Sequence, residues 1–264
     1  MSDPEYSDDY TDPRLAVFYD QLNPWGPESD FYLDLVLAAR SVLDVGCGTG
    51  AILRAARAAG HTGRLVGLDP AAAMLDQARA GSGMAGQATD VEWILGDLGS
   101  VSFDGEFDLV LMSGHVFQVF LTDDEIAATL AAVRAALDGD GRFAFETLNP
   151  RLRPWERWTN GAQVVAADGT VVDTANTDPR LVEPGIVEVV GRFASASWER
   201  EVLCPSRFRF VGEPELDGLL TAAGLSVEDR FGGWDRRPFT GQEPEIITIA
   251  RPVRDTSARG AHRS

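Results

Sequence analysis

The chain has 264 residues, 44% hydrophobic and 24% charged, which suits one large globular domain or a domain with a substantial insertion. Its formal net charge of −18 disfavours binding to nucleic acids and to anionic membranes, because both present phosphate groups that a negatively charged protein repels. The sequence contains no lysine, which excludes a lysine Schiff base, a Walker-type phosphate lysine and a Tyr-x-x-x-Lys catalytic pair.

The chain shows no targeting or membrane signal. It has no apolar run of about 18 residues that would predict a membrane-spanning helix. Residues 1–12 are polar and acidic, unlike a signal peptide, and are expected to be disordered or to become ordered only when a ligand binds. Cys47 and Cys204 lie far apart and show no metal-ligand spacing. We therefore expect a cytoplasmic protein without a metal site.

Strands and helices are expected to alternate over the first 150 residues. Helical segments are expected at 13–20 and, after the turn-forming Asn23-Pro24-Trp25-Gly26-Pro27, from an N-cap at Asp30 to residue 39. The expected strands are 41–45, 64–68, 91–95, 107–112 and 141–147, and the helices are 51–59, 71–80 and 123–137. Thr122 and Glu125 form a capping box for the last helix. This order predicts an α/β fold with a doubly wound, mostly parallel sheet.

The pattern changes after residue 150. Short β-branched and aromatic runs predict antiparallel strands at 164–167, 171–174, 187–196 and 206–211. A helix at 213–223 and strands at 225–231 and 245–250 follow, and residues 251–264 are expected to be a loose tail. The predicted organisation is a core at 13–150, an antiparallel β insertion at 151–212 after strand five, and a return to the core at 213–250.

A glycine-rich loop, Gly46-Cys47-Gly48-Thr49-Gly50, joins the strand at 41–45 to the next helix. Glycine permits tight turns and close approach of a ligand, and the helix N-terminus favours an anionic group. Gly46, Gly48 and Ala51 also satisfy a dinucleotide fingerprint, so an NAD(P)-dependent oxidoreductase is an alternative. Asp69 follows the second strand, where it reaches the ribose of either cofactor. Asp97 follows the third strand, where it can accept a hydrogen bond from an adenine amino group, which a nicotinamide enzyme does not require.

These motifs together resemble those of class I S-adenosylmethionine (SAM)-dependent methyltransferases of the small-molecule type. The resemblance rests on residues 44–50, on Leu68-Asp69-Pro70 with Met74, on Gly96-Asp97-Leu98 and on residues 107–110, in the family's order. It is close over residues 13–150 and looser over 213–250. It implies a Rossmann-like fold and methyl transfer from SAM, giving S-adenosylhomocysteine, to an oxygen or nitrogen of a small metabolite or natural product. A non-catalytic SAM-binding protein is a further alternative.

The resemblance also implies roles for individual residues. Asp44 would hold the glycine loop and reach the amino group of SAM, Met74 would pack on the adenine, and Tyr19 resembles a lid tyrosine. Tyr19 and Trp25 are equally expected as plain core aromatics. The residues expected to hold SAM are Tyr19, Trp25, Asp44, Gly46, Cys47, Gly48, Gly50, Asp69, Pro70, Met74, Gly96, Asp97, Leu98 and Ser113.

His115 is the candidate catalytic residue, because it follows a core strand at the edge where open α/β sheets bind ligands. An imidazole there could act as general base, or it could only orient the ligands. Glu146 is a second candidate at the substrate site, or it stabilises its own loop. In the insertion, the candidates to contact a substrate are Trp155, Trp158, Phe193, Trp198 and Arg209, with core filling or a dimer surface as alternatives. The expected partner is a small-molecule acceptor bound by a monomer or homodimer, with no nucleic acid and no membrane.

Overall fold

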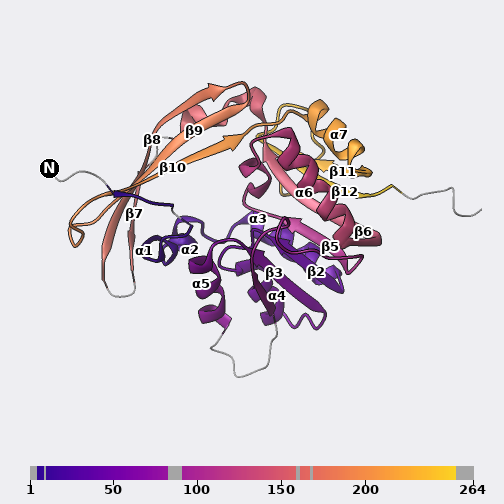
Figure 1. Ribbon diagram of the computed structural model, residues 1–264, viewed down its shortest axis with the longest axis horizontal. Helices are drawn as coiled ribbons and strands as arrows, with labels where there is room; N and C mark the ends of the chain where they lie inside the picture. The colour runs from indigo at the N-terminus through magenta and orange to yellow at the C-terminus, as the bar shows by residue number, and fades with distance from the viewer. Residues whose placement is uncertain (1–4, 9, 83–90, 159–160, 167–168, 254–264) are drawn as a thin grey trace, which may run out of the picture.

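The computed structural model describes residues 5–8, 10–82, 91–158, 161–166 and 169–253, which form two β-sheets with flanking helices (Figure 1). The strands of the larger sheet are β2 (Ser41–Val45), β3 (Arg64–Asp69), β4 (Val91–Leu95), β5 (Phe107–Met112), β6 (Leu137–Leu148), β11 (Leu225–Phe231) and β12 (Glu245–Pro252). The strands of the smaller sheet are β1 (Glu5–Tyr6), β7 (Gly161–Val165), β8 (Val171–Glu183), β9 (Ile186–Ala194) and β10 (Val202–Arg209).

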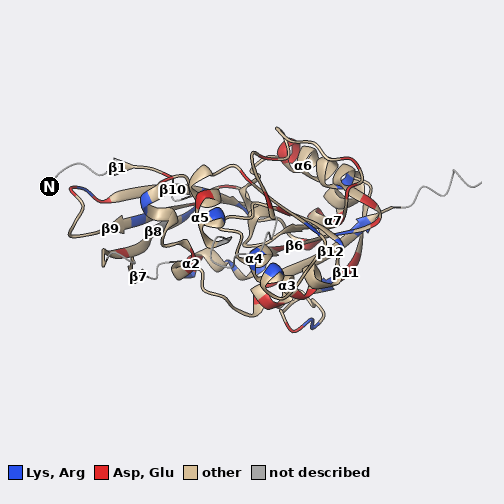
Figure 2. Ribbon diagram, turned by 90° about the horizontal axis from the view of Figure 1, so that it is seen from below, with Lys and Arg blue, Asp and Glu red and all other residues tan. Residues whose placement is uncertain are grey.

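The helices lie mainly around the larger sheet. They are α1 (Pro13–Ala16), α2 (Tyr19–Leu22), α3 (Pro27–Ala38), α4 (Ala51–Ala58), α5 (Ala72–Ser82), α6 (Asp123–Ala136) and α7 (Glu213–Ala222), with 3-10 turns η1 (Val116–Val119), η2 (Pro150–Leu152) and η3 (Pro154–Arg157). None of the helices in the described ranges is long and apolar enough to cross a membrane. The acidic and arginine segments are scattered over several elements in Figure 2.

The larger sheet has the order β11-β12-β6-β5-β2-β3-β4 and is parallel from β6 to β4. Strands β11 and β12 add antiparallel to β6. The chain runs outward from β2 in one direction through β3 and β4, and then in the other through β5 and β6. Ligands bind open α/β sheets at such a reversal, beyond the carboxyl ends of the strands. The predicted doubly wound fold is therefore confirmed, and its crevice lies between the ends of β2 and β5.

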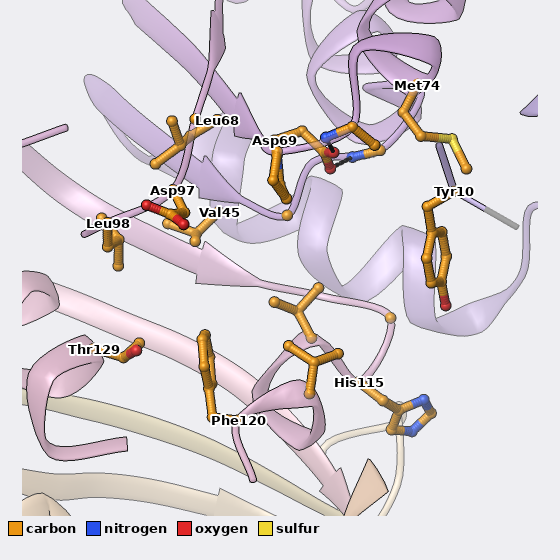
Figure 3. Close-up of a pocket in the computed structure, with 18 of the residues that line it drawn as sticks. Tyr10, Val45, Leu68, Asp69, Met74, Asp97, Leu98, His115, Phe120 and Thr129 are labelled. Atoms are coloured by element: carbon orange, nitrogen blue, oxygen red, sulfur yellow. Dashed lines mark hydrogen bonds between the residues drawn. The ribbon is translucent and has the colours of Figure 1, made fainter. Parts of the chain in front are cut away.

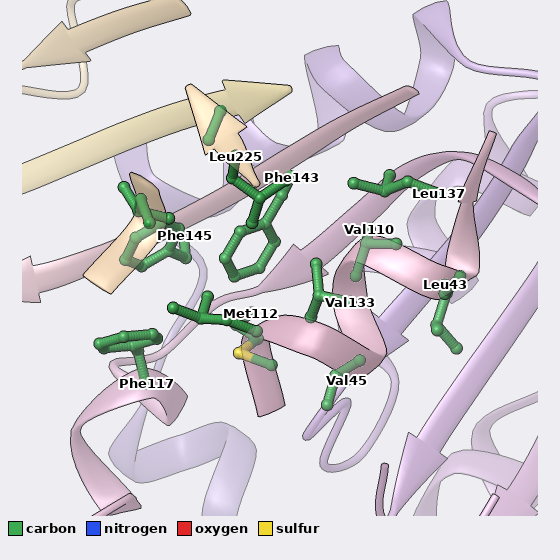
Figure 4. Packing of buried hydrophobic residues seen from close by; sticks show 14 of the residues in the cluster. Leu43, Val45, Val110, Met112, Phe117, Val133, Leu137, Phe143, Phe145 and Leu225 are labelled. Carbon is green, nitrogen blue, oxygen red and sulfur yellow. The ribbon is translucent and has the colours of Figure 1, made fainter. Parts of the chain in front are cut away.

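Alternating residues of the central strands feed two separate cores. Val42 packs with Tyr32 of α3 and Leu53 of α4 on one face of the sheet. Leu43 packs with Val133 of α6 on the other face, in a cluster that includes the aromatic rings shown in Figure 4. This alternation follows from the two-residue period of a strand, and it means that both faces of the sheet are covered by helices.

Several helices begin or end at residues other than the predicted ones. The predicted cap at Asp30 is wrong: α3 begins at Pro27, whose fixed φ suits the first helical position, and Asp30 instead accepts a 2.7 Å hydrogen bond from Nε1 of Trp25. The helix expected at 13–20 is divided into α1 and α2. The capping box is confirmed, since Thr122 Oγ1 accepts from the Glu125 amide at 3.2 Å and Glu125 accepts from the Thr122 amide at 2.9 Å.

The N-terminal segment is not disordered where it is described. Residues 5–6 form β1, which pairs in parallel with Val202–Leu203 of β10, and Asp12 caps α1 by accepting from the Arg14 amide at 2.9 Å. The polar composition of residues 1–12 concealed this pairing, because backbone hydrogen bonds to a distant strand leave no local signal. Residues 1–4, 9, 167 and 254–264, on which other predictions fall, lie outside the described residues. The remainder of the expected tail continues β12 as far as Pro252.

The smaller sheet has the order β1-β10-β9-β8-β7. Its strands β7 to β10 lie within the predicted insertion and are antiparallel, and β1 from the N-terminus adds to them in parallel. The smaller sheet stands beside α1 and α2 at one end of the larger sheet (Figure 1). Its core includes Val172, Phe193 and Val202, which pack against Leu15 and Phe18 from the N-terminal helices. The N-terminal helices therefore lie between the two sheets, next to the crevice.

Candidate active site

The glycine loop leaves β2 in a conformation that favours glycine. Gly46, Gly48 and Gly50 have φ of +71°, +55° and +68°. A Cβ added to Gly46 would stand 2.6 Å from Cγ2 of Val116, and one added to Gly50 would stand 2.1 Å from the Trp93 ring. At Gly48 the nearest atom would be Cε1 of Tyr19, at 3.8 Å. Gly46 and Gly50 are thus required by protein packing, whereas Gly48 leaves room for a ligand.

A first cavity of about 640 Å³ lies between the glycine loop, the ends of β3 and β4, and the segment from η1 to α6. Asp69 and Met74 lie on one side of it, with His115 and Phe120 on the other (Figure 3). The sequence-predicted residues that line it are Tyr19, Gly46, Gly48, Asp69, Pro70, Met74, Gly96, Asp97, Leu98 and His115. The motifs that follow three separate strands therefore meet around one cavity.

Two of the carboxylates that line this cavity, Asp69 and Asp97, are held by backbone amides. Asp69 is buried and accepts from the amides of Gly48 and Ala71, both at 2.8 Å, so it fastens the glycine loop to the end of β3. Asp97 is exposed and accepts from the amide of Ser100 at 2.8 Å, and its hydrogen bonds with Ser100 lower the pKa of its carboxyl. Contacts of Asp69 with the ribose and of Asp97 with the adenine remain predictions.

A second cavity of about 710 Å³ lies on the other side of the glycine loop, towards the smaller sheet. Its lining includes Asp44, Cys47 and Ser113 from the predicted cofactor site, and Phe193 from the insertion. The residues that line both cavities are Tyr10, Tyr19, Gly46, Gly114 and His115. His115 thus stands at the junction of the two cavities.

The backbone of His115 is strained into the left-handed region, with φ of +61° directly after Gly114 at +68°. Its amide donates to Oε1 of Glu146 at 2.6 Å, and its Nε2 lies 3.1 Å from Oε2 of Glu245. Burial lowers the pKa of His115, but the hydrogen bond with Glu245 and the charges of Glu146 and Glu28 raise it to about 9. In the absence of ligands the imidazole is therefore protonated at neutral pH.

Three glutamates surround His115 from separate elements. Glu28 of α3 accepts from the Gly114 amide at 3.1 Å, lines the second cavity, and has its carboxyl pKa raised by burial. Glu146 of β6 is fully buried, accepts from the hydroxyl of Tyr32 as well as from the His115 amide, and has its pKa raised by burial to about 7. Glu245 begins β12. Together they place three carboxyl groups around one imidazole.

Asp44 is 1% exposed, and its Oδ1 has no hydrogen-bond partner among the described residues. Burial, with the nearby charges of Asp69 and Glu146, raises the pKa of Asp44 to about 8. A buried carboxylate oxygen without a partner is costly and requires a cationic ligand or protonation. Since Asp44 lines the second cavity beside the glycine loop, it suits the ammonium group of SAM.

This arrangement predicts that SAM binds more tightly as the pH rises from 6 to 7.5, a range in which an α-amino group with a pKa of about 8 keeps its charge. An ammonium group favours the ionised carboxylate, so binding below the raised pKa of Asp44 must release its proton. The affinity should then change by up to about tenfold per pH unit below that pKa. Calorimetric titration in buffers of different ionisation enthalpy measures both the affinity and the released proton. The isosteric Asp44→Asn variant should bind more weakly and lose the pH dependence, whereas pH-independent binding by the unaltered protein would contradict this role.

Some sequence-predicted residues lie outside the described lining of both cavities. Trp25 is 46% exposed and bonded to Asp30, and Gly50 caps α4 beneath Trp93. Glu146 lies behind His115 and accepts from its amide, so it holds the loop of His115 and not its own loop, which was the alternative prediction. Trp25, Gly50 and Glu146 are therefore absent from the described lining of both cavities.

Some of the predicted substrate-contacting residues of the insertion also lie outside the described lining of the two cavities. Trp155 is buried against the ring of Phe210, 4.6 Å away, and Trp198 lies under the guanidinium of Arg14. Arg209 pairs with Glu215 at 2.8 Å and with Asp123 of α6. None of these three side chains belongs to the described lining of the first or the second cavity. Trp158 lines a third, smaller cavity.

Sequence reasoning missed Tyr10, Glu28 and Glu245 at the cavity junction. Tyr10 lies in the segment expected to be disordered, and its ring is 6.2 Å from that of Tyr19. Glu28 lies in the first turn of α3, but the sequence predicts that this helix begins only after Asp30. Glu245 reaches the site because β12 pairs with β6, so that Glu245 lies opposite Leu148. That pairing has no signal in the local sequence.

A doubly wound sheet, an open glycine loop, carboxylates at the carboxyl ends of β2, β3 and β4, and two adjoining cavities define a class I SAM-dependent methyltransferase. Residues 42–141 match the family model described as a methyltransferase domain. The chain is 30% identical to the cypemycin N-terminal methyltransferase of a Streptomyces species over 227 residues, which cover 81% of this chain and 83% of that protein. The chain belongs to the SAM-dependent methyltransferase family and is an enzyme.

Solved structures share the fold over most of the chain. The CcbJ methyltransferase of Streptomyces caelestis has a TM-score of 0.71 at 21% identity, covering 94% of this chain and 100% of that one. SAM-bound CalS10, an amino pentose methyltransferase from Micromonospora echinaspora, has a TM-score of 0.66 at 25% identity, covering 92% and 98%. The oxidoreductase alternative is thereby set aside in favour of methyl transfer from SAM.

Proposed function

We propose that this methyltransferase transfers the methyl group of SAM to the nitrogen of a small-molecule amine held in the second cavity. The observation that carries the proposal is the group of carboxylates around His115. Glu28 lines the cavity, and Glu245 lies within hydrogen-bonding distance of the imidazole. Bound SAM supplies a methyl group on a positively charged sulfur, which is already activated for attack.

Electrostatics favour an amine over a hydroxyl acceptor. An amine enters as an ammonium ion, which nearby carboxylates attract, whereas an alcohol gains little from them. Loss of a proton from an alcohol would also create a negative charge beside Glu28 and Glu245, which like-charge repulsion opposes. The chain's net charge of −18 acts in the same direction. The cavity junction is thus suited to a cationic acceptor.

The ammonium must lose a proton before its nitrogen can attack, and His115 is placed to accept it. The neighbouring carboxylates keep the imidazole protonated when no cation is present. A cationic ligand at the junction lowers the pKa of His115, because two like charges at close range disfavour each other. The neutral imidazole then accepts the ammonium proton. Alignment of the nitrogen with the methyl group provides most of the remaining rate enhancement.

Two similar proteins are named for methylation of nitrogen, whereas three other relatives are named as 2-phytyl-1,4-naphtoquinone methyltransferases. The cypemycin methyltransferase is named for methylation at an N-terminus. The sugar N-methyltransferase KedS8 from Streptoalloteichus shares the fold, with a TM-score of 0.70 at 18% identity over 95% of this chain and 98% of that one.

The proposal is tested with matched amines and alcohols that share one carbon skeleton. The purified protein is incubated with SAM labelled in its methyl group, and each product is identified by mass spectrometry. Methylation of the amines with little reaction of the alcohols is expected. Equal or preferred methylation of the alcohols would contradict the amine assignment and leave methyl transfer from SAM in place.

A further inference from the structure

A third cavity, of about 230 Å³, adjoins the second along the inner face of the smaller sheet. Asn176 and Gly191 line both cavities. Asn176 of β8 pairs with Gly191 of β9, which pairs in turn with Cys204 of β10. This row of three residues across the sheet marks the passage from one cavity to the other.

Gly191 stands inside a strand without a left-handed backbone conformation that would require glycine. Its φ lies outside the left-handed region, and β9 pairs with β10 without a register shift from Phe193 to Ile186 in these described strands. A glycine inside a strand costs stability, and it occurs typically at a bulge or where a ligand approaches closely. The pairing of β9 with β8 shifts register between Thr177 and Arg180, close to Gly191, and the absent side chain gives room to the Phe193 ring. The same open position belongs to the lining that the second and third cavities share, where a ligand can approach the backbone closely.

The space left by the missing side chain of Gly191 lies on the face of the smaller sheet that lines the cavities. A Cβ on Gly191 would stand 3.3 Å from Cε2 of Phe193 and 3.7 Å from Cβ of Cys204. Both neighbours belong to the face that lines the cavities, since alternate residues of a strand share a face. Gly191 thus stands where the second and third cavities meet, while Phe208 lines the third cavity and the first.

The far wall of the third cavity is aromatic. The rings of Trp158 and Phe208 meet edge to face with centroids 5.6 Å apart. Val189 and Cys204 complete the apolar lining, and Asn176 and Ser206 add polar groups. An apolar cavity of about 150 Å³ is enough to bind benzene, so this cavity has room for one ring with a polar substituent.

We infer that the acceptor is an amine joined to a ring, with its nitrogen beside His115 and its ring beyond Gly191, against Trp158 and Phe208. The inference rests on the proposed function for the identity of the reacting group, but the ring site itself is independent of it. It predicts that discrimination among acceptors depends on residues of the smaller sheet that lie away from the cofactor motifs.

The test compares four acceptors: ethylamine, 2-phenylethylamine, ethanol and 2-phenylethanol. The measured quantity is the ratio of kcat/KM with the ring to kcat/KM without it, together with calorimetric binding to protein loaded with S-adenosylhomocysteine. The unaltered protein should prefer the ring compounds, and Gly191→Ala should reduce the ratio about tenfold, the usual effect of one misplaced methyl group in an apolar site. Trp158→Leu, which cannot block the passage, should also reduce it. Gly218→Ala is the matched control, since a Cβ there meets no atom within 4 Å.

The outcomes separate the two proposals. Ring preference that is reduced in Gly191→Ala and Trp158→Leu supports the ring site. If this preference is seen with the alcohols instead of the amines, the ring site stands and the amine assignment fails. Equal activity towards ring and ring-free acceptors, an equal loss for both in Gly191→Ala, or no binding of the ring compounds would overturn the inference. Retained S-adenosylhomocysteine binding shows that each variant is folded.

Discussion

Replacing His115 with alanine is expected to lower kcat by about 100-fold, the lower end of the usual contribution of a general base. The imidazole stands at the junction of the two cavities and is held by the carboxylates of Glu146 and Glu245. SAM affinity should change little, because the residues expected to bind the cofactor stay in place. Initial-rate kinetics with saturating SAM, together with calorimetric SAM binding, measure the two effects separately.

Two further variants distinguish a general base from an orienting residue. His61→Gln is the control, because His61 lies away from both cavities, with its Nε2 2.8 Å from the carbonyl oxygen of Ala39. Glu245→Gln removes a carboxylate that raises the pKa of His115, so the rise of kcat/KM with pH should move to lower pH with the same acceptor. An unchanged kcat in His115→Ala would limit His115 to orientation and assign proton transfer to Glu28 or water.

Gly48→Ala is expected to weaken SAM binding more than about tenfold, since a methyl group would occupy the space that the open glycine loop leaves for a ligand. The new Cβ meets only Cε1 of Tyr19, at 3.8 Å, so packing within the protein is preserved. The φ of +55° adds a backbone cost of about 1–2 kcal/mol to the free energy of folding. Calorimetry measures the affinity, and chemical denaturation measures the stability.

Gly60→Ala separates the backbone cost from the loss of ligand space. Gly60 has φ of +89° and no atom within 4 Å of an added Cβ, and it lies outside the described lining of the cavities. Both variants should therefore lose similar stability, while Gly60→Ala keeps its affinity for SAM. Equal SAM affinities in the two variants would show that the ligand does not approach Gly48.

Local sequence patterns predicted the larger sheet well and the N-terminal region poorly. The apolar strand at 41–45, the glycines after it and the capping box at Thr122 each depend on residues close together in the chain. The two-residue strand β1 depends instead on hydrogen bonds to β10, nearly 200 residues away in sequence. The start of α3 was misplaced because Asp30 is a good N-cap residue, but the fixed φ of Pro27 allowed an earlier start.

By itself, the sequence determined the alternating strands and helices, the glycine loop and the carboxylates of Asp69 and Asp97, because these follow from local hydrophobic runs and from backbone freedom at glycine. The tertiary structure alone decided which side chains meet His115. Glu28 and Glu245 come from the first turn of α3 and from the last strand, and only helix packing and strand order bring them together. The same holds for Gly191, whose missing side chain gains meaning only when its neighbours across the sheet are known.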